Sequence, residues 1–349
     1  MLFAAALAFG VGLLILPVLL TDAREWRQAA SIHPAMLLLP LVLTFASYAA
    51  MSLSYQGIAE AAGCRLSLRE WMRITVVSNT ANYLVTSAGL SGFGVRMYLL
   101  AQRGVPSGRA VLISLVQTFL TNFTLLFFIV VGFITVVLRG SLTGVAVSVA
   151  AGVVVVFASV LAYAVVLIFH RRLRRRTLFF IADTGHRLLR RIVPRWTPGR
   201  VRLWRFQHNL NEGLEFLFAR KARIVAPAAW ILLDWVLTLA ILWSAFRAVD
   251  YPVTYGVVVV GFAVGICLSL VSIVPAGLGV MDSSMWAVFV GLDVPPGQAA
   301  IAVLIFRIAY YLAPLVVSLF FFRSLMLGAM HGMRGPGRPR FDTPLPPSI

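Results

Sequence analysis

The sequence predicts an all-α polytopic membrane protein with about six full transmembrane helices and two interrupted, re-entrant helical hairpins in an inverted repeat. Of its 349 residues, 60% are hydrophobic and 12% are charged, and the mean hydropathy is +0.91. A water-soluble domain carries roughly 25% charged residues. Several apolar segments also reach the ~20 residues that a helix needs to cross hydrocarbon. Glycine, proline and polar residues interrupt two of these segments.

The uninterrupted apolar segments are expected to be full transmembrane helices, and they are 1–20, 35–62, 110–138, 143–169, 224–248 and 300–322. The first has no basic residues before it, and it is longer than the apolar core of a secretory signal peptide. We therefore expect it to be a membrane helix. The two interrupted segments are 74–101 and 256–292.

A strongly basic stretch, 170–223, separates a membrane half at 1–169 from another at 224–322. It holds 15 Lys and Arg residues against three acidic residues. Basic loops of membrane proteins stay in the cytoplasm and attract anionic lipid headgroups. We expect an amphipathic cytoplasmic loop here rather than a nucleic-acid-binding segment. The basic, Pro- and Gly-rich tail 323–349 is expected to be disordered and cytoplasmic.

These two cytoplasmic segments predict the orientation of the interrupted hairpins. Residues 223 and 323 are both expected in the cytoplasm, so the chain between them must cross the membrane an even number of times. The two full helices 224–248 and 300–322 account for two crossings. The segment 256–292 must then enter and leave from the outside, whereas the same counting places the opening of 74–101 on the cytoplasmic side. We expect a multi-pass protein of the inner or plasma membrane with both termini in the cytoplasm.

The two interrupted segments share an ordered pair of motifs. AGL at 88–90 and VPxG at 105–108 correspond to AGL at 276–278 and VPxG at 294–297. Related hairpins of opposite orientation are typical of inverted-repeat transporters, whose binding site lies near the membrane midplane. Ordinary kinks or short turns outside the membrane are the alternative interpretation.

Glycine and proline have a physical role at such interruptions. Non-helical backbone inside a membrane is tolerated only where it is buried in protein or lines a wet cavity. Glycine permits close approach, proline removes a helical donor, and half-helix ends present N–H groups to a ligand. The residues to which we assign this structural role are Gly89, Gly92, Gly94, Pro275, Gly277 and Gly279.

Ionisable groups at membrane depth are costly and are therefore candidates for function. Asp282 and Arg307 are expected either to form a structural ion pair or to hold a lipid headgroup between them. Arg96 is a candidate phosphate-binding residue, because guanidinium binds phosphate bidentately, or a surface residue at the end of the first hairpin. Asp234 is a candidate proton-coupling carboxylate, a partner for an arginine, or a residue near the headgroups.

Uncharged residues complete the candidate substrate-binding set. Asn79, Asn82, Thr86 and Ser87 partly share one helix face, where they either line a pocket or join neighbouring helices. Tyr310 is either a ligand contact or a packing aromatic residue.

The sequence carries no motif of an enzyme or a metal centre. Its two cysteines and five histidines lack ligand spacing, and there is no GxSxG, HExxH, CxxC or GxxxxGK[ST] motif. We therefore expect no catalytic residue, no metal, no cofactor and no ATP-driven step.

Two stretches carry a resemblance to a known family. Residues 78–115 read SNTANYLVTSAGLSGFGVRMYLLAQRGVPSGRAVLISL, and residues 272–314 read SIVPAGLGVMDSSMWAVFVGLDVPPGQAAIAVLIFRIAYYLAP. They resemble two regions of the flippase-like transmembrane domain of the lysylphosphatidylglycerol synthase family, and the resemblance covers nearly the whole chain. The first family region reads Asn-x-x-x-Pro-x-x-x-Gly-Glu-x-x-Arg, and the second reads Pro-x-Gly-x-Gly-x-x-Glu. Here Gly92 to Gly94 stand where Gly-Glu is expected, and Asp282 replaces the second Glu.

The resemblance implies a flippase or transporter that moves a polar-headed lipid between leaflets. The expected partners are anionic or zwitterionic phospholipids or isoprenoid-linked lipids. Full-length relatives carry a soluble aminoacyl-transfer domain after the membrane part, whereas only the tail 323–349 follows here, so we expect no synthase activity. Two alternatives are a membrane partner of a separate lipid- or glycan-modifying enzyme, docking through 170–223, and an intramembrane lipid-modifying transferase.

Overall fold

The computed structural model describes residues 34–84, 90–138, 221–271 and 279–321, together with scattered positions between 152 and 170. Every regular element within these residues is a helix, which confirms the predicted all-α class. Those long and apolar enough to cross a membrane are Leu38–Ala61, Ser107–Gly132, Ala222–Ala248 and Pro296–Phe321. The predicted spans 1–20 and 143–169, the loop 170–223 and the tail 323–349 lie almost entirely outside the described residues.

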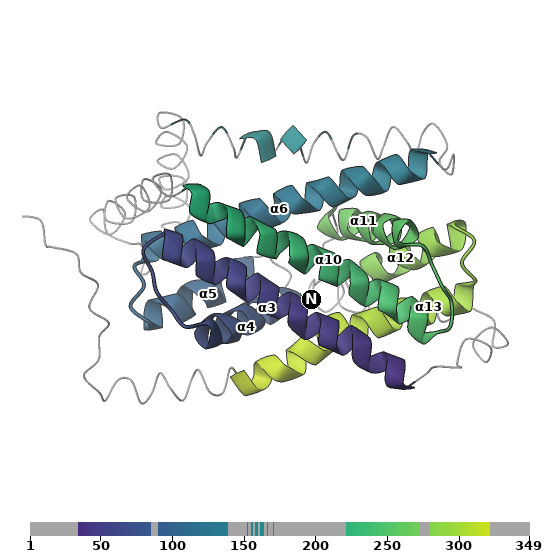
Figure 1. Cartoon of the computed structure of the whole chain (residues 1–349), viewed down its shortest axis with the longest axis horizontal. Coiled ribbons are helices and arrows are strands. Elements are labelled where there is room, and N and C mark those ends of the chain that lie inside the picture. The colour runs from purple at the N-terminus through teal and green to yellow at the C-terminus, as the bar shows by residue number, and fades with distance from the viewer. Residues whose placement is uncertain are drawn as a thin grey trace, which may run out of the picture.

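Helices α3 (Leu38–Ala61) and α10 (Val225–Ala248) lie against each other through the middle of the molecule (Figure 1). A 3₁₀ turn precedes each of them, η1 (Pro34–Leu37) before α3 and η3 (Lys221–Ile224) before α10. The two helices approach closely because Gly57 has no side chain. A Cβ atom at Gly57 would lie 2.8 Å from Cγ of Pro227.

The first hairpin consists of α4 (Leu68–Leu84) and α5 (Leu90–Gln102), which pack together. At 1.5 Å per residue, α5 is about 20 Å long, shorter than a hydrocarbon core of ~30 Å. Helix α4 begins before residue 74, the predicted start, because Ser67 and Glu70 form a capping box. The Ser67 N–H donates to Glu70 Oε2 at 3.1 Å, and the Glu70 N–H donates to Ser67 Oγ at 3.4 Å.

Two glycines predicted to lie in the first break are helical. Gly92 and Gly94 belong to α5, which already begins at Leu90. Gly92 still permits a close approach, because a Cβ atom there would clash with the Ser78 carbonyl oxygen and the Asn82 side chain on α4. A Cβ atom at Gly94 would meet no atom within 4 Å. The third predicted glycine, Gly89, lies outside the described residues.

The second hairpin consists of α11 (Tyr255–Val271) and α12 (Val280–Gly291). Two glycines four residues apart on α11 form the contact. A Cβ atom at Gly261 would clash with the Phe289 ring, and one at Gly265 would lie 2.5 Å from Met285 Cγ. Small residues at this spacing let helices approach closely in membranes. Pro275 and Gly277 lie outside the described residues.

Helices α6 (Ser107–Leu138) and α13 (Pro296–Arg307) follow the two hairpins. After α13 comes a π-helical turn, η5 (Ile308–Leu312), and the helix then continues to Phe321. In this turn the Ala313 N–H donates to the Ile308 carbonyl, five residues earlier. Pro314 has no N–H to donate, which favours a widened turn just before it. Single π-turns inside α-helices occur frequently at functional sites.

The elements repeat along the chain with a nearly constant offset. The set η1, α3 and α4 has the same lengths as η3, α10 and α11, and each element starts 187 residues after its counterpart. The turns after α5 and α12 also match. Gly104 and Asp293 both have positive φ, at 75° and 64°, and each precedes a Val-Pro pair. The Val N–H then donates to a carbonyl five residues back in both turns, at 3.1 and 3.0 Å.

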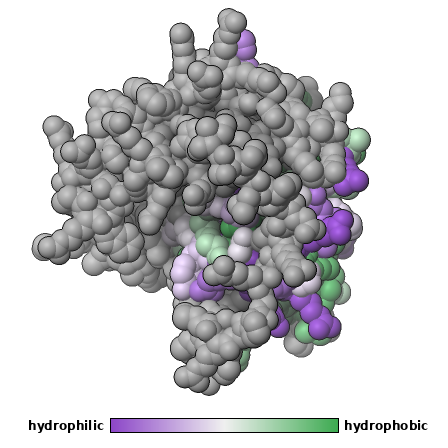
Figure 2. Space-filling view, turned by 90° about the vertical axis from the view of Figure 1, so that its left-hand side faces the viewer, coloured by the Kyte–Doolittle hydropathy of each residue, from purple (hydrophilic) through white to green (hydrophobic). Residues whose placement is uncertain are grey.

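Large apolar side chains cover the outer faces of the long helices. Exposed examples are Val42, Phe123, Phe127, Val225, Leu319 and Phe320. On the face shown in Figure 2, hydrophobic side chains reach the surface beside hydrophilic ones. Contiguous apolar surface is unusual on a water-soluble monomer, whereas acyl chains of a bilayer can cover it.

Candidate functional site

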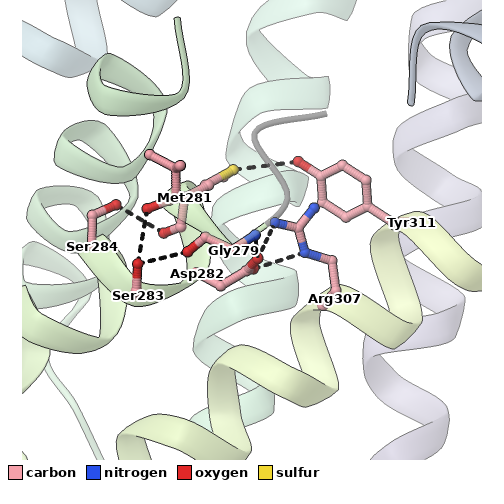
Figure 3. Close-up of polar contacts among 8 residues, drawn as sticks. Gly279, Met281, Asp282, Ser283, Ser284, Arg307 and Tyr311 are labelled. Carbon is pink, nitrogen blue, oxygen red and sulfur yellow. Dashed lines mark hydrogen bonds and ion pairs between the residues drawn. The ribbon is translucent and has the colours of Figure 1, made fainter. Parts of the chain in front are cut away.

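Asp282 and Arg307 form a buried bidentate ion pair between the first turn of α12 and the end of α13 (Figure 3). Arg307 Nε donates to Asp282 Oδ1 at 2.7 Å, and Nη2 donates to Oδ2 at 2.5 Å. The exposed fractions of Asp282 and Arg307 are 1% and 8%. The pair joins the second hairpin to the last described helix.

Gly279 explains why the second hairpin places its acid here. This residue caps α12 with φ = 79°, a left-handed conformation that favours glycine. Its N–H donates to Asp282 Oδ2 at 2.8 Å, and its carbonyl accepts a hydrogen bond from Ser283 Oγ at 2.6 Å. A carboxylate in the first turn also interacts favourably with the positive end of the helix dipole.

The π-turn places aromatic rings around Arg307. The guanidinium carbon lies 4.1 Å from the centre of the Tyr311 ring, and the Tyr311 hydroxyl donates to Met281 Sδ at 3.4 Å. Tyr310 stacks on Phe306, with ring centres 5.4 Å apart. Of the two interpretations that the sequence left open, this geometry favours a structural pair, because the Asp282 carboxylate already accepts three hydrogen bonds.

Arg96 on α5 is buried, with 5% exposed, so it is not a surface residue. Its Nη2 donates to Ser78 Oγ at 3.2 Å, and its guanidinium carbon lies 4.3 Å from the centre of the Tyr55 ring. The Tyr55 ring stacks in turn on Trp71. Arg96 Nε has no hydrogen-bond partner, and no carboxylate among the described residues pairs with this guanidinium.

Asp234 is buried between α10 and α3, with 5% exposed. Ser47 Oγ donates to Asp234 Oδ1 at 2.5 Å and lies 3.5 Å from Thr238 Oγ1. Asp234 lies about 14 Å along α10, near the middle of this helix, which is long and apolar enough to cross a membrane. In the described part of the chain, no arginine, lysine or histidine pairs with it.

Helix α3 contacts both Arg96 and Asp234. Its Tyr55 is buried and lies with its ring against the Arg96 guanidinium, and its Ser47 donates to Asp234. The buried charged side chains of the described residues are Arg96, Asp234, Asp282 and Arg307. Asp282 and Arg307 form the closed pair, whereas Arg96 and Asp234 each contact α3.

The amide side chains of Asn79 and Asn82 contact neighbouring helices. Asn82 Oδ1 accepts a hydrogen bond from the Gly92 N–H at 2.7 Å and so satisfies a free donor in the first turn of α5. Asn79 Nδ2 lies 2.7 Å from Met51 Sδ and joins α4 to α3. Thr86 and Ser87 lie outside the described residues.

Ser47, Tyr55 and Ser78 are not among the residues predicted from the sequence, although the structure places all three beside a candidate charge. A pattern in the sequence could have indicated the two residues on α3, Ser47 and Tyr55. Ser47 and Ser54, like Tyr48 and Tyr55, are seven residues apart, so each pair shares one helix face. Ser54 Oγ, on the same face as Ser47, donates to Gln117 Oε1 at 2.9 Å.

Fold and site together define a multi-pass α-helical membrane protein with buried charges on two helical hairpins. The chain belongs to the family described as the lysylphosphatidylglycerol synthase TM region, whose model matches residues 3–318. It is also similar to a phosphatidylglycerol lysyltransferase of Staphylococcus haemolyticus (strain JCSC1435), with 28% identity over 86 residues. That match covers 25% of this chain and 10% of the relative. The resemblance predicted from the two hairpin sequences is confirmed.

Proposed function

We propose that this protein moves a polar-headed lipid between the leaflets of a cell membrane. Membership of a family of lipid-synthase membrane regions supports a lipid substrate. The observation that carries the proposal is Arg96, a buried guanidinium with an unused donor and no carboxylate partner among the described residues. A buried cation is stable only when it is paired and hydrogen-bonded, and a lipid phosphate supplies both.

In this proposal the hairpins α4–α5 and α11–α12 are re-entrant and open to opposite sides of the membrane. The matching element lengths support an internal repeat, and opposite openings follow from the predicted cytoplasmic segments. A lipid enters sideways, its headgroup binds Arg96, and rocking of one repeat against the other exposes the headgroup to the other leaflet. Asp282 and Arg307 keep the second hairpin and the last helix together during that motion.

Reconstituted protein tests the proposal directly. The full chain in liposomes is expected to accelerate the leaflet exchange of a fluorescent phospholipid, read out by quenching of the outer-leaflet label. Arg96→Gln is expected to slow exchange by roughly tenfold or more, because a charge-assisted hydrogen bond contributes about 1.5–3 kcal/mol.

Arg103→Gln is the matched control. Arg103 follows α5, keeps 17% of its side chain exposed and pairs with Glu70 at 3.3 Å, away from the Arg96 contacts. The exchange rate of the Arg103→Gln variant should stay within about twofold of the wild-type rate, because most substitutions outside buried sites have small effects. If the wild-type protein accelerates the leaflet exchange of no phospholipid and no isoprenoid-linked lipid, the proposed function is contradicted.

A further inference from the structure

We propose that the protein carries a net-negative lipid headgroup together with one proton, with Arg96 binding the headgroup phosphate and Asp234 binding the proton. This rests on the proposed function and adds the charge of the substrate and the coupling ion. A phosphate diester with no compensating cation, such as that of phosphatidylglycerol, has the required chemistry.

The buried charges of the described residues are compensated unequally. Arg307 is neutralised by Asp282, whose oxygens already accept hydrogen bonds from Arg307 and from the Gly279 N–H. Arg96 and Asp234 have no such partner in the described ranges. The segments 85–89 and 272–278, which separate the helices of each hairpin, contain no acidic residue in the sequence. Among the described residues, Asp234 is therefore the buried carboxylate that remains to balance Arg96.

Helix α3 contacts both of these charges. Its Tyr55 ring lies against the Arg96 guanidinium, and its Ser47 hydroxyl donates to Asp234. Arg96 and Asp234 do not form a closed pair with each other, so each can still bind a ligand. A closed pair would have to be broken before either group could bind one.

Asp234 contacts the residue that corresponds to it in the proposed repeat. Ser47 and Asp234 are 187 residues apart, which is also the offset between α3 and α10. The two side chains therefore occupy equivalent positions of the two repeats and contact each other at 2.5 Å. A residue that contacts its own repeat equivalent lies where the two repeats meet, and transporters with inverted repeats bind substrates and coupling ions there.

Coupling follows from electrostatics. With the site empty, ionised Asp234 balances Arg96. When an anionic headgroup binds Arg96, the phosphate neutralises the guanidinium, and ionised Asp234 becomes a buried anion without a free cation nearby. A proton taken from water then converts the carboxylate to a carboxylic acid, whose O–H can donate to Ser47 Oγ or Thr238 Oγ1. The proton and the lipid leave on the other side, and a headgroup with a single negative charge then moves without net charge transfer.

Other titratable groups near α10 do not replace Asp234 in this role. On the described elements packed against α10 they are Tyr48, Tyr55 and Glu60 on α3, Lys221 and Arg223 in η3, Tyr255 and Cys267 on α11, Arg307 on α13, and Tyr310 and Tyr311 in η5. Phenols and thiols stay largely protonated near neutral pH, and lysine and arginine stay cationic. Glu60 is exposed and accepts a hydrogen bond from Gln56, and Arg307 is held by Asp282. The charged residue of α6, Arg109, lies in its first turn.

The test uses the full chain in sodium-free liposomes loaded with a pH-sensitive dye. Acyl-labelled phosphatidylglycerol is the anionic probe, and acyl-labelled phosphatidylcholine is the zwitterionic one. The rate at which the wild type exchanges phosphatidylglycerol is expected to rise at least fivefold from pH 8 to pH 6. That rate is also expected to exceed the rate for phosphatidylcholine at least fivefold. The exchange of phosphatidylglycerol is expected to carry protons into the lumen. Asp234→Asn is expected to abolish the pH dependence and the proton flux.

Asp293→Asn is the matched control, because Asp293 is exposed and asparagine tolerates its positive φ. It should keep the wild-type pH profile. Should Asp234→Asn not elute as a single folded species, Ser47→Ala replaces it. Removing the donor to the carboxylate is expected to move the midpoint of the rate profile to higher pH by at least half a unit.

The outcomes separate the two proposals. No exchange of either probe by the wild type, at any pH, overturns the proposed function itself. Exchange with equal rates for both probes, a pH profile that Asp234→Asn or Ser47→Ala leaves unchanged, or exchange that needs added sodium overturns the inference alone.

Discussion

At the scale of single residues, the two buried arginines differ in how they are compensated. Arg307 has a bidentate carboxylate, an aromatic ring and a capped helix around it. Arg96 has one serine hydroxyl and one tyrosine ring, with Nε unpaired. Removing one partner of a buried pair leaves an uncompensated charge, which is much more costly than removing both.

This difference predicts a double-mutant cycle. Asp282→Leu and Arg307→Met should each lower the free energy of unfolding by about 3–5 kcal/mol, and the double variant should lose less than either single variant. Thermal unfolding in detergent, followed by loss of the folded species in size-exclusion chromatography, measures the order of stability. Losses that simply add would show that the two side chains are not coupled and would contradict the structural pair.

Some properties of the buried charges can be predicted from the sequence, and others cannot. The sequence indicates that Asp282 and Arg307 can pair, because both are ionisable groups in apolar segments. It does not indicate whether that pair is closed, since this depends on Gly279 and on the π-turn that carries Tyr311. The burial of Arg96 depends on Tyr55 and Ser78 from two other helices, and no local pattern contains that information.

At the scale of elements, glycines determine how closely the helices of each hairpin pack. The sequence predicted both hairpins but assigned Gly92 and Gly94 to a break, since glycine disfavours helix interiors. In the structure they are helical, and only Gly92 faces α4 at close range. Tertiary packing therefore decides what each glycine does.

The contrast between these glycines gives a matched pair of variants. Gly92→Ala should destabilise the protein by about 1–3 kcal/mol, because the methyl group clashes with the Ser78 carbonyl and the Asn82 amide. Gly94→Ala has free space and should be neutral or stabilising by up to about 1 kcal/mol, because alanine favours the helix. Melting temperatures of the two variants in the same detergent measure this. Equal shifts would mean that α5 does not approach α4 through Gly92.

At the scale of the whole molecule, elements of matching length extend beyond the motifs that the two hairpins share. The shared motifs cover each hairpin and the start of the following helix. The structure extends the correspondence back through α3 and α10, whose sequences share little beyond a proline at Pro40 and Pro227. Helix length and position persist where side-chain identity does not, so a motif search alone misses this part. In the proposed repeat, Asp234 lies at the contact between the two halves, and Arg96 lies on one hairpin only.

We propose that Arg96 binds the headgroup, and lipid binding tests that proposal most directly. Native mass spectrometry of the full chain in detergent, titrated with phosphatidylglycerol, measures the dissociation constant of the first bound lipid. We expect Arg96→Gln to raise that constant roughly tenfold or more, with Arg103→Gln within about twofold of the wild type. Equal dissociation constants for all three proteins would show that the buried guanidinium does not bind the headgroup and would contradict the account.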